Sequence, residues 1–93
     1  MVGLELRIRI RPEKRTEFLQ MREMLGGKAR PEGCVEQKIY EEIDGSNSFL
    51  WSERWSTRDP LEKYMKSEDF RMLLGAVEVL GELEDQRTVE LSQ

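Results

Sequence analysis

Residues 34–55, CVEQKIYEEIDGSNSFLWSERW, hold two runs rich in β-branched and aromatic residues, separated by a short polar segment. The separating residues 44–47, Asp-Gly-Ser-Asn, have the composition of a tight turn. The stretch therefore predicts a hairpin whose strands span residues 34–43 and 48–55. Side chains alternate between the two faces of a strand, so the second strand carries four residues on one face: Phe49, Trp51, Glu53 and Trp55.

Strand and helix patterns flank this hairpin on both sides. Residues 4–10 read Leu-Glu-Leu-Arg-Ile-Arg-Ile, which predicts a strand with its four apolar residues on one face. The apolar spacing becomes helical over 13–25, and the glycines at 26–27 are expected to end this helix. A helix pair is expected from 56–59 to Leu80, with Ser67 capping its second member. Residues 88–91 predict a short last strand with Val89 and Leu91 facing inward.

The order strand, helix, strand, strand, helix pair, strand predicts an α+β fold of the ferredoxin-like, split βαββαβ type. Its sheet would be antiparallel and four-stranded, and the 93 residues are expected to form a single domain over 1–93. Helices cover one face of such a sheet. The other face is expected to carry the following residues, with Cys34 as a further candidate: Glu5, Arg7, Arg9, Tyr40, Leu50, Ser52, Arg54, Thr88 and Glu90. Alternation alone favours a solvated face, whereas the small core favours a second copy packed on it.

Composition excludes several classes of function. The chain has fifteen Lys and Arg residues and nineteen Asp and Glu residues, which gives a net charge of −4. It therefore lacks the excess of basic residues that is typical of nucleic-acid-binding proteins. The longest apolar run, residues 72–77, is far shorter than a membrane span, and charge near the N-terminus argues against a signal peptide. We therefore expect a cytoplasmic protein with neither a membrane nor a nucleic-acid partner. The absence of histidine does not favour a metal site, and Cys34 is expected to be a small buried residue.

Several segments, in their order and spacing, resemble the antibiotic biosynthesis monooxygenase (ABM) family. They are residues 31–34 (PEGC), 40–44 (YEEID), Phe49 with 53–55 (ERW), and 64–70 (YMKSEDF). The likeness covers nearly the whole chain. It implies a homodimeric α+β barrel, in which two subunits pack through their sheet faces with the helices outside. It also implies a cofactor-independent monooxygenase that oxidises an aromatic quinol or phenol between sheet and helices.

The same resemblance implies where a site would lie. Trp55 matches the tryptophan that lines the substrate cavity of phenol-oxidising members, although it also fits a core position. Glu53 lies between two tryptophans on one strand face and could take a phenolic proton, or it could be held in a structural ion pair. The remaining expected substrate-binding residues, each of which also suits core packing, are Trp51, Tyr64, Phe70 and Phe49.

The chain also departs from the patterns of characterised members. Trp51 and Leu61 stand where phenol-oxidising members have asparagine and tyrosine, and Asp69 stands where many members have histidine. Leu74 lies near the place of the haem-binding histidine, so haem degradation is not expected in a chain without histidine. The alternative is a non-catalytic dimeric barrel that binds a small apolar ligand or serves as a stress-associated domain.

Overall fold

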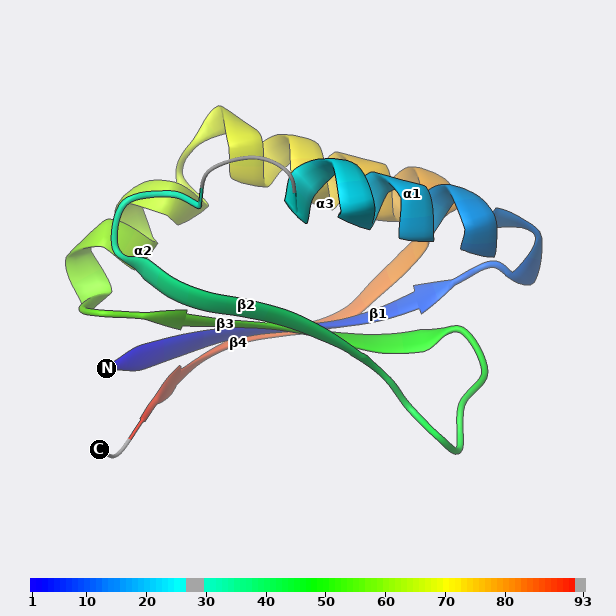
Figure 1. Ribbon diagram of the computed structural model, residues 1–93, viewed down its shortest axis with the longest axis horizontal. Coiled ribbons are helices and arrows are strands. Elements are labelled where there is room, and N and C mark those ends of the chain that lie inside the picture. Colours follow the sequence, from blue (N-terminus) through cyan, green and yellow to red (C-terminus); the bar gives the residue numbers. More distant parts are fainter. Residues whose placement is uncertain (27–29, 92–93) are drawn as a thin grey trace.

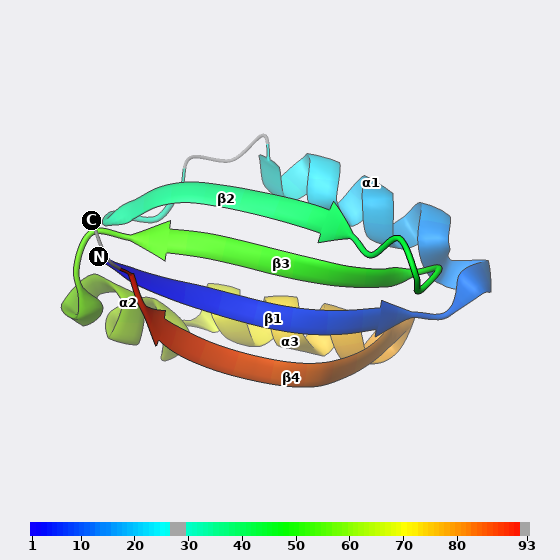
Figure 2. The same ribbon diagram turned by 90° about the horizontal axis from the view of Figure 1, so that it is seen from below.

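The computed structural model describes residues 1–26 and 30–91, which form one antiparallel sheet with helices on a single face (Figure 1). The elements in chain order are β1 (Val2–Ile10), the 3-10 turn η1 (Pro12–Lys14), α1 (Arg15–Gly26), β2 (Cys34–Glu41), β3 (Ser48–Trp55), α2 (Arg58–Met65), α3 (Glu68–Leu80) and β4 (Gly81–Glu90). The strand order is β2-β3-β1-β4, as Figure 2 shows from the uncovered side. The predicted α+β, ferredoxin-like arrangement is confirmed.

Local chemistry explains where the helices begin. Pro12 opens η1, where its missing N–H is not needed, and α1 continues directly from this turn. Ser67 caps α3 as predicted, because its Oγ accepts a hydrogen bond of 3.2 Å from the backbone N–H of Phe70. The helix α1 ends at Gly26, and Gly27, the second glycine of the predicted stop, lies outside the described residues.

The core lies between the sheet and the helices. On β1 the alternating pattern places Leu4, Leu6, Ile8 and Ile10 against the helices, each at most 1% exposed. Val2 of β1 and residues of the other strands and helices complete this buried cluster, the latter being Phe18, Phe49, Trp51, Trp55, Leu61, Phe70, Leu73 and Val77. Burial of this apolar surface holds both layers together and forms the frame in which the candidate site lies.

The last strand differs from its prediction in length and in direction of its side chains. It spans Gly81–Glu90, and its pairing with β1 shifts register between Arg7 and Ile8, where β4 contains an extra residue. One extra residue in a strand turns each later side chain of that strand to the opposite face of the sheet. The predictions for Val89 and Leu91 were therefore wrong: Val89 pairs with Gly3, and both side chains pack over Gly3 on the uncovered face.

The same bulge moves Thr88 and Glu90, which were expected on the uncovered face, to the helix side of the sheet. They pair with Leu4 and Val2, and Glu90 forms an ion pair with Arg58 of α2. Cys34 was a further candidate for the uncovered face. It pairs instead with Trp55, whose side chain is buried under the helices, because a second register shift follows Cys34 in β2.

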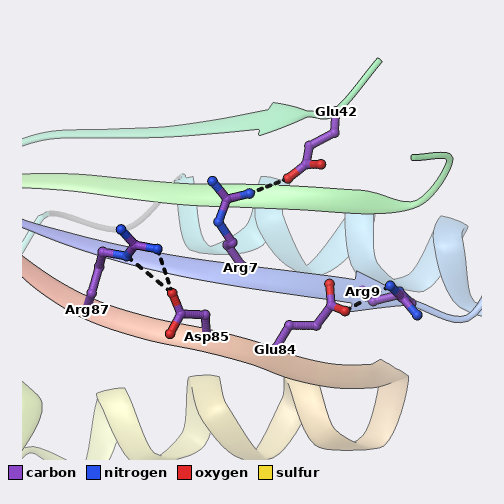
Figure 3. A network of polar contacts seen from close by, with 6 residues as sticks. All are labelled: Arg7, Arg9, Glu42, Glu84, Asp85 and Arg87. Atoms are coloured by element: carbon purple, nitrogen blue, oxygen red, sulfur yellow. Dashed lines mark hydrogen bonds and ion pairs between the residues drawn. The ribbon is translucent and has the colours of Figure 1, made fainter. Parts of the chain in front are cut away.

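The uncovered face, called the open face below, carries a layer of ion pairs (Figure 3). Arg7 bonds Glu42 at 2.6 Å, Arg9 bonds Glu84 at 2.9 Å and Arg87 bonds Asp85 at 3.0 Å. The first bridge joins β1 to the residue that follows β2, the second joins β1 to β4, and the third lies within β4. Leu50, Tyr40 and Val89 add apolar surface to the same face.

A polar clamp fixes the start of α1 over the β2–β3 turn. The Arg15 guanidinium donates to Glu41 (2.7 Å) and to the Asn47 side chain (3.0 Å), and it lies 5.7 Å from the centre of the Phe49 ring. Glu41 also accepts a hydrogen bond from the backbone N–H of Asn47, which has a φ of 65°. These donors lower the pKa of Glu41 to about 2, with the Arg15 hydrogen bonds as the larger cause.

Candidate functional site

A cavity of about 220 Å³ lies between the sheet, α1 and α3. Most of its wall is apolar, and polar groups come from Arg30, Gln37, Tyr64 and Asp69. The other lining residues are Met21, Pro31, Trp51, Met72, Leu73 and Ala76. An apolar hollow with a few polar groups is the usual form of a small-molecule site. The volume is smaller than the roughly 300–1,000 Å³ typical of drug-sized ligands.

Glu53 is buried directly behind this cavity, with 1% of its surface exposed. Its Oε1 accepts the indole N–H of Trp55 at 3.0 Å, and its Oε2 accepts the indole N–H of Trp51 at 3.0 Å. Gln37 Nε2 donates a third hydrogen bond, 2.7 Å long, to Oε2. Three N–H donors thus converge on a group that, when ionised, only accepts hydrogen bonds. The expected alternative of an ion pair is absent among the described residues, because all three donors are uncharged.

Tyr64 connects the cavity to the buried aromatic residues. Its ring lies 5.1 Å from that of Trp55 and 5.3 Å from that of Phe70, measured between centroids. Burial, and then the negative charges of carboxylates led by Glu53, raise the pKa of the Tyr64 phenol well above its ordinary value. The hydroxyl of Tyr64 therefore stays protonated at neutral pH and can donate a hydrogen bond.

The structure brings together only some of the expected site residues. Trp51 and Tyr64 line the cavity, whereas Trp55 and Phe70 are buried behind Tyr64 and do not line it. Phe49 packs against Phe18, with 4.7 Å between their ring centres, and is also absent from the cavity wall. Trp55 offers no free N–H to a ligand, because Glu53 already accepts it.

Three polar lining residues were missed from the sequence: Arg30, Gln37 and Asp69. The signal for Gln37 is its pairing register, since it lies directly opposite Glu53 on the neighbouring strand. Residues in such cross-strand pairs share a face of the sheet. Arg30 and Asp69 belong to a loop and to the first turn of α3, where strand periodicity gives no information.

A second, more open hollow of about 760 Å³ adjoins the cavity and shares Pro31, Tyr64 and Asp69 with it. Its other lining residues are Glu32, Gly33, Ser56, Pro60, Lys63 and Ser67. Gly33 adopts a φ of +91°, and a Cβ there would lie 2.6 Å from the Pro60 side chain. This glycine lets the loop before β2 lie close against α2.

Cys34 lies under the same loop and donates a weak hydrogen bond to the Glu36 carbonyl at 3.6 Å. Burial first, and then the negative charge of Glu53, raise the pKa of its thiol, which opposes formation of a nucleophilic thiolate. Among residues 1–26 and 30–91, no three His, Cys, Asp or Glu residues gather as metal ligands would. The helices in those ranges are too short or too polar to cross a membrane.

Comparisons of sequence identify relatives of this chain. The family model described as antibiotic biosynthesis monooxygenase matches residues 1–73. The Synechocystis protein sll1783 is 31% identical over 64 residues, which are 68% of this chain and 44% of that protein. This chain therefore spans less than half the length of that cyanobacterial relative. YcnE of Bacillus subtilis is 28% identical over 72 residues, 76% of each chain.

Solved structures with the same fold agree with this match. A protein of Deinococcus radiodurans that is assigned to the antibiotic biosynthesis monooxygenases superposes with a TM-score of 0.85 at 16% identity, covering 100% of this chain and 94% of that one. SnoaB of Streptomyces nogalater, a cofactor-independent oxygenase, gives a TM-score of 0.75 at 18% identity, covering 99% and 93%. With most of its length matched by the family model, this chain belongs to the antibiotic biosynthesis monooxygenase family.

Proposed function

We propose that the protein is a cofactor-independent monooxygenase that oxidises an aromatic phenol or quinol of one or two rings. The observation that carries this proposal is the cavity of about 220 Å³, which is walled by Trp51 and Tyr64 and also lined by polar side chains. Flat aromatic walls suit a planar ring, and the polar groups suit its hydroxyl. Family membership and the likeness to the fold of SnoaB support the reaction class.

The chemistry needs only the substrate and dioxygen. For a phenol with a free position opposite its hydroxyl, the ring loses the hydroxyl proton and dioxygen adds to that carbon. The peroxide then loses water to leave a quinone. One oxygen atom becomes the new carbonyl, the other leaves as water, and the substrate supplies all four electrons. The protein would bind the ring, help remove the proton and keep bulk water out.

Within this proposal, Glu53 acts as a positioning residue. It holds the Trp51 indole and the Gln37 amide, both of which face the cavity, through hydrogen bonds of 3.0 and 2.7 Å. Trp55 and Phe70 would support Tyr64 from behind, and Phe49 would anchor the far end of the core. In this proposal, the residues that were expected to be catalytic or to bind substrate have different roles within one network. They are Glu53, Trp55, Trp51, Tyr64, Phe70 and Phe49.

Oxygen uptake tests the reaction directly. With 1-naphthol and a panel of one- and two-ring phenols and quinols, the wild type should consume oxygen above the autoxidation rate. With ¹⁸O₂, the quinone formed from 1-naphthol should carry one labelled atom. Ala76→Phe, which fills the cavity from α3, should lower the rate at least 10-fold. Val79→Phe, at a position 67% exposed on the same helix, should not.

Failure of every compound to drive uptake would refute the proposed reaction. If the same compounds nevertheless raised the melting temperature of the wild type but not of Ala76→Phe, the cavity would bind without turnover. That result would favour the non-catalytic, ligand-binding barrel instead.

We also propose a homodimer that packs through the open face. Helices already cover the other face. The open face combines the paired charges of Figure 3 with apolar surface from Leu50, Tyr40 and Val89, which the strand pairing places there. Light scattering at micromolar concentration should give about twice the chain mass of 11.0 kDa. Leu50→Asp should shift the mass toward the monomer, whereas Val79→Asp on the helix side should not. A wild-type mass near 11.0 kDa would refute the dimer.

A further inference from the structure

Two carboxylates are close enough to the cavity to be considered as acceptors of the substrate proton. Glu53 is unsuited to direct contact, because it is 1% exposed and both of its oxygens accept hydrogen bonds from neighbouring side chains. The side chains of Trp51 and Gln37 separate it from the cavity. A general base must reach the proton that it removes, within hydrogen-bond distance or through one water.

Asp69, by contrast, is exposed and lines the cavity itself, so a ligand there can contact its carboxylate directly. It is the only carboxylate among the described residues that line the cavity. It lies in the first turn of α3, which the Ser67 cap fixes through its hydrogen bond to Phe70 N. Ser67 also donates to the Tyr64 carbonyl, at 2.5 Å, so one residue fixes the backbone beside both Asp69 and Tyr64.

Asp69 also lies next to the second hollow and close to Tyr64. It lines the cavity and the adjoining open hollow, both of which include Tyr64. Its charge contributes to the raised pKa of Tyr64, as expected for a carboxylate near that phenol. Among the described residues, three others that are charged line the two hollows: Arg30 on the cavity side, and Glu32 and Lys63 on the open side.

We infer that Asp69 is the catalytic base of this site, accepting the hydroxyl proton of the phenol while the ring stacks on the cavity wall. The O–H bond of the substrate breaks, the proton moves to a carboxylate oxygen of Asp69, and the electron pair remains on the phenolate oxygen. As the ring gives electrons to dioxygen the hydroxyl becomes much more acidic, so a carboxylate is a sufficient acceptor. This inference rests on the proposed function, and it replaces Glu53 by Asp69 as the group that contacts the substrate.

Turnover provides the first test. Asp69→Asn should lower kcat at least 100-fold with the phenols that the wild type oxidises, while KM changes by less than 3-fold. Asp69→Glu should recover part of the rate. Glu68→Gln removes the same charge from the preceding residue, which does not line the cavity, and should leave kcat within 2-fold. Circular dichroism and melting temperature would check that each variant folds.

A second readout does not depend on turnover. A 4-nitrophenol bound in the cavity reports its own ionisation by absorbance, and a carboxylate that accepts its O–H bond favours the neutral form. Asp69→Asn should therefore lower the apparent pKa of the bound nitrophenol by at least half a unit relative to the wild type. Glu68→Gln should shift it by less than a quarter of that change.

The outcomes separate the two levels of the proposal. A wild type that turns over phenols, with Asp69→Asn within 3-fold of its kcat, would overturn the role of Asp69 and leave the proposed function standing. A wild type without turnover would refute the proposed function. In that case an unchanged nitrophenol titration, or no binding of nitrophenol, would overturn the contact with Asp69 as well.

Discussion

Glu53→Leu should lower the free energy of unfolding by about 3–5 kcal/mol, the range expected when a buried polar network loses its central acceptor. The side chain is 1% exposed and accepts three N–H hydrogen bonds, from Gln37, Trp51 and Trp55. Leucine has a similar volume but no acceptor, so the three donors would be left without their common partner. Each unsatisfied buried donor costs about 1–3 kcal/mol, and relaxation of Gln37 toward the cavity recovers part of this.

Chemical denaturation followed by tryptophan fluorescence measures the change. Glu53→Gln keeps one oxygen acceptor and adds an N–H₂ group, so we expect a smaller loss of about 1–3 kcal/mol. Glu62→Gln, an exposed position on α2, serves as the control and should stay within about 0.5 kcal/mol of the wild type. A Glu53→Leu protein within about 1 kcal/mol of the wild type would contradict the central role of this carboxylate.

Gly81→Ala is expected to have a comparably large effect, a loss of at least about 3 kcal/mol or a failure to fold. Gly81 is the junction between α3 and β4, and it pairs with Ile10 at the end of β1. A Cβ at this position would lie 2.0 Å from the Arg9 carbonyl oxygen and 2.8 Å from the Ile10 Cα. Both contacts are with backbone, so the strand itself would have to move.

Gly75→Ala, in the helix α3 that precedes Gly81, is expected to give the opposite result. A Cβ at Gly75 meets no atom within 4 Å, and the position is an exposed helix interior. Alanine should therefore stabilise the protein by about 0.5–1 kcal/mol. Thermal unfolding of the two variants side by side should give shifts of opposite sign, and a Gly81→Ala protein as stable as the wild type would contradict the close approach of β4 to β1.

Sequence periodicity predicted the elements of this fold well, because a strand or helix that buries one face repeats its apolar residues at a regular spacing. The alternation of residues 4–10 and of Phe49, Trp51, Glu53 and Trp55 correctly identified the side chains under the helices. The Ser67 cap was predicted from a local signal and is present. These features depend on residues that are neighbours along the chain.

Features that depend on pairing between strands were not predictable in the same way. An extra residue in β4 reverses the direction of Val89 and Leu91, and nothing in the sequence of that strand marks it. Gln37 meets Glu53 only through the register of β2 against β3. Asp69 reaches the cavity because α3 packs beside α1 over the sheet (Figure 1), an arrangement in space that no spacing encodes.

The bulge opposite Arg7 and Ile8 divides β4 into two halves whose side chains alternate out of phase with each other. Residues of β4 before the bulge keep the facing set by the core, whereas residues 85–91 are reversed relative to them. Deleting the extra residue would exchange the inner and outer sides of that half-strand in a single step, turning Val89 toward the helices and Glu90 away from Arg58. A single inserted residue at this point therefore decides which side chains of the second half of β4 form the open face, while the facing of β1 stays set by the core.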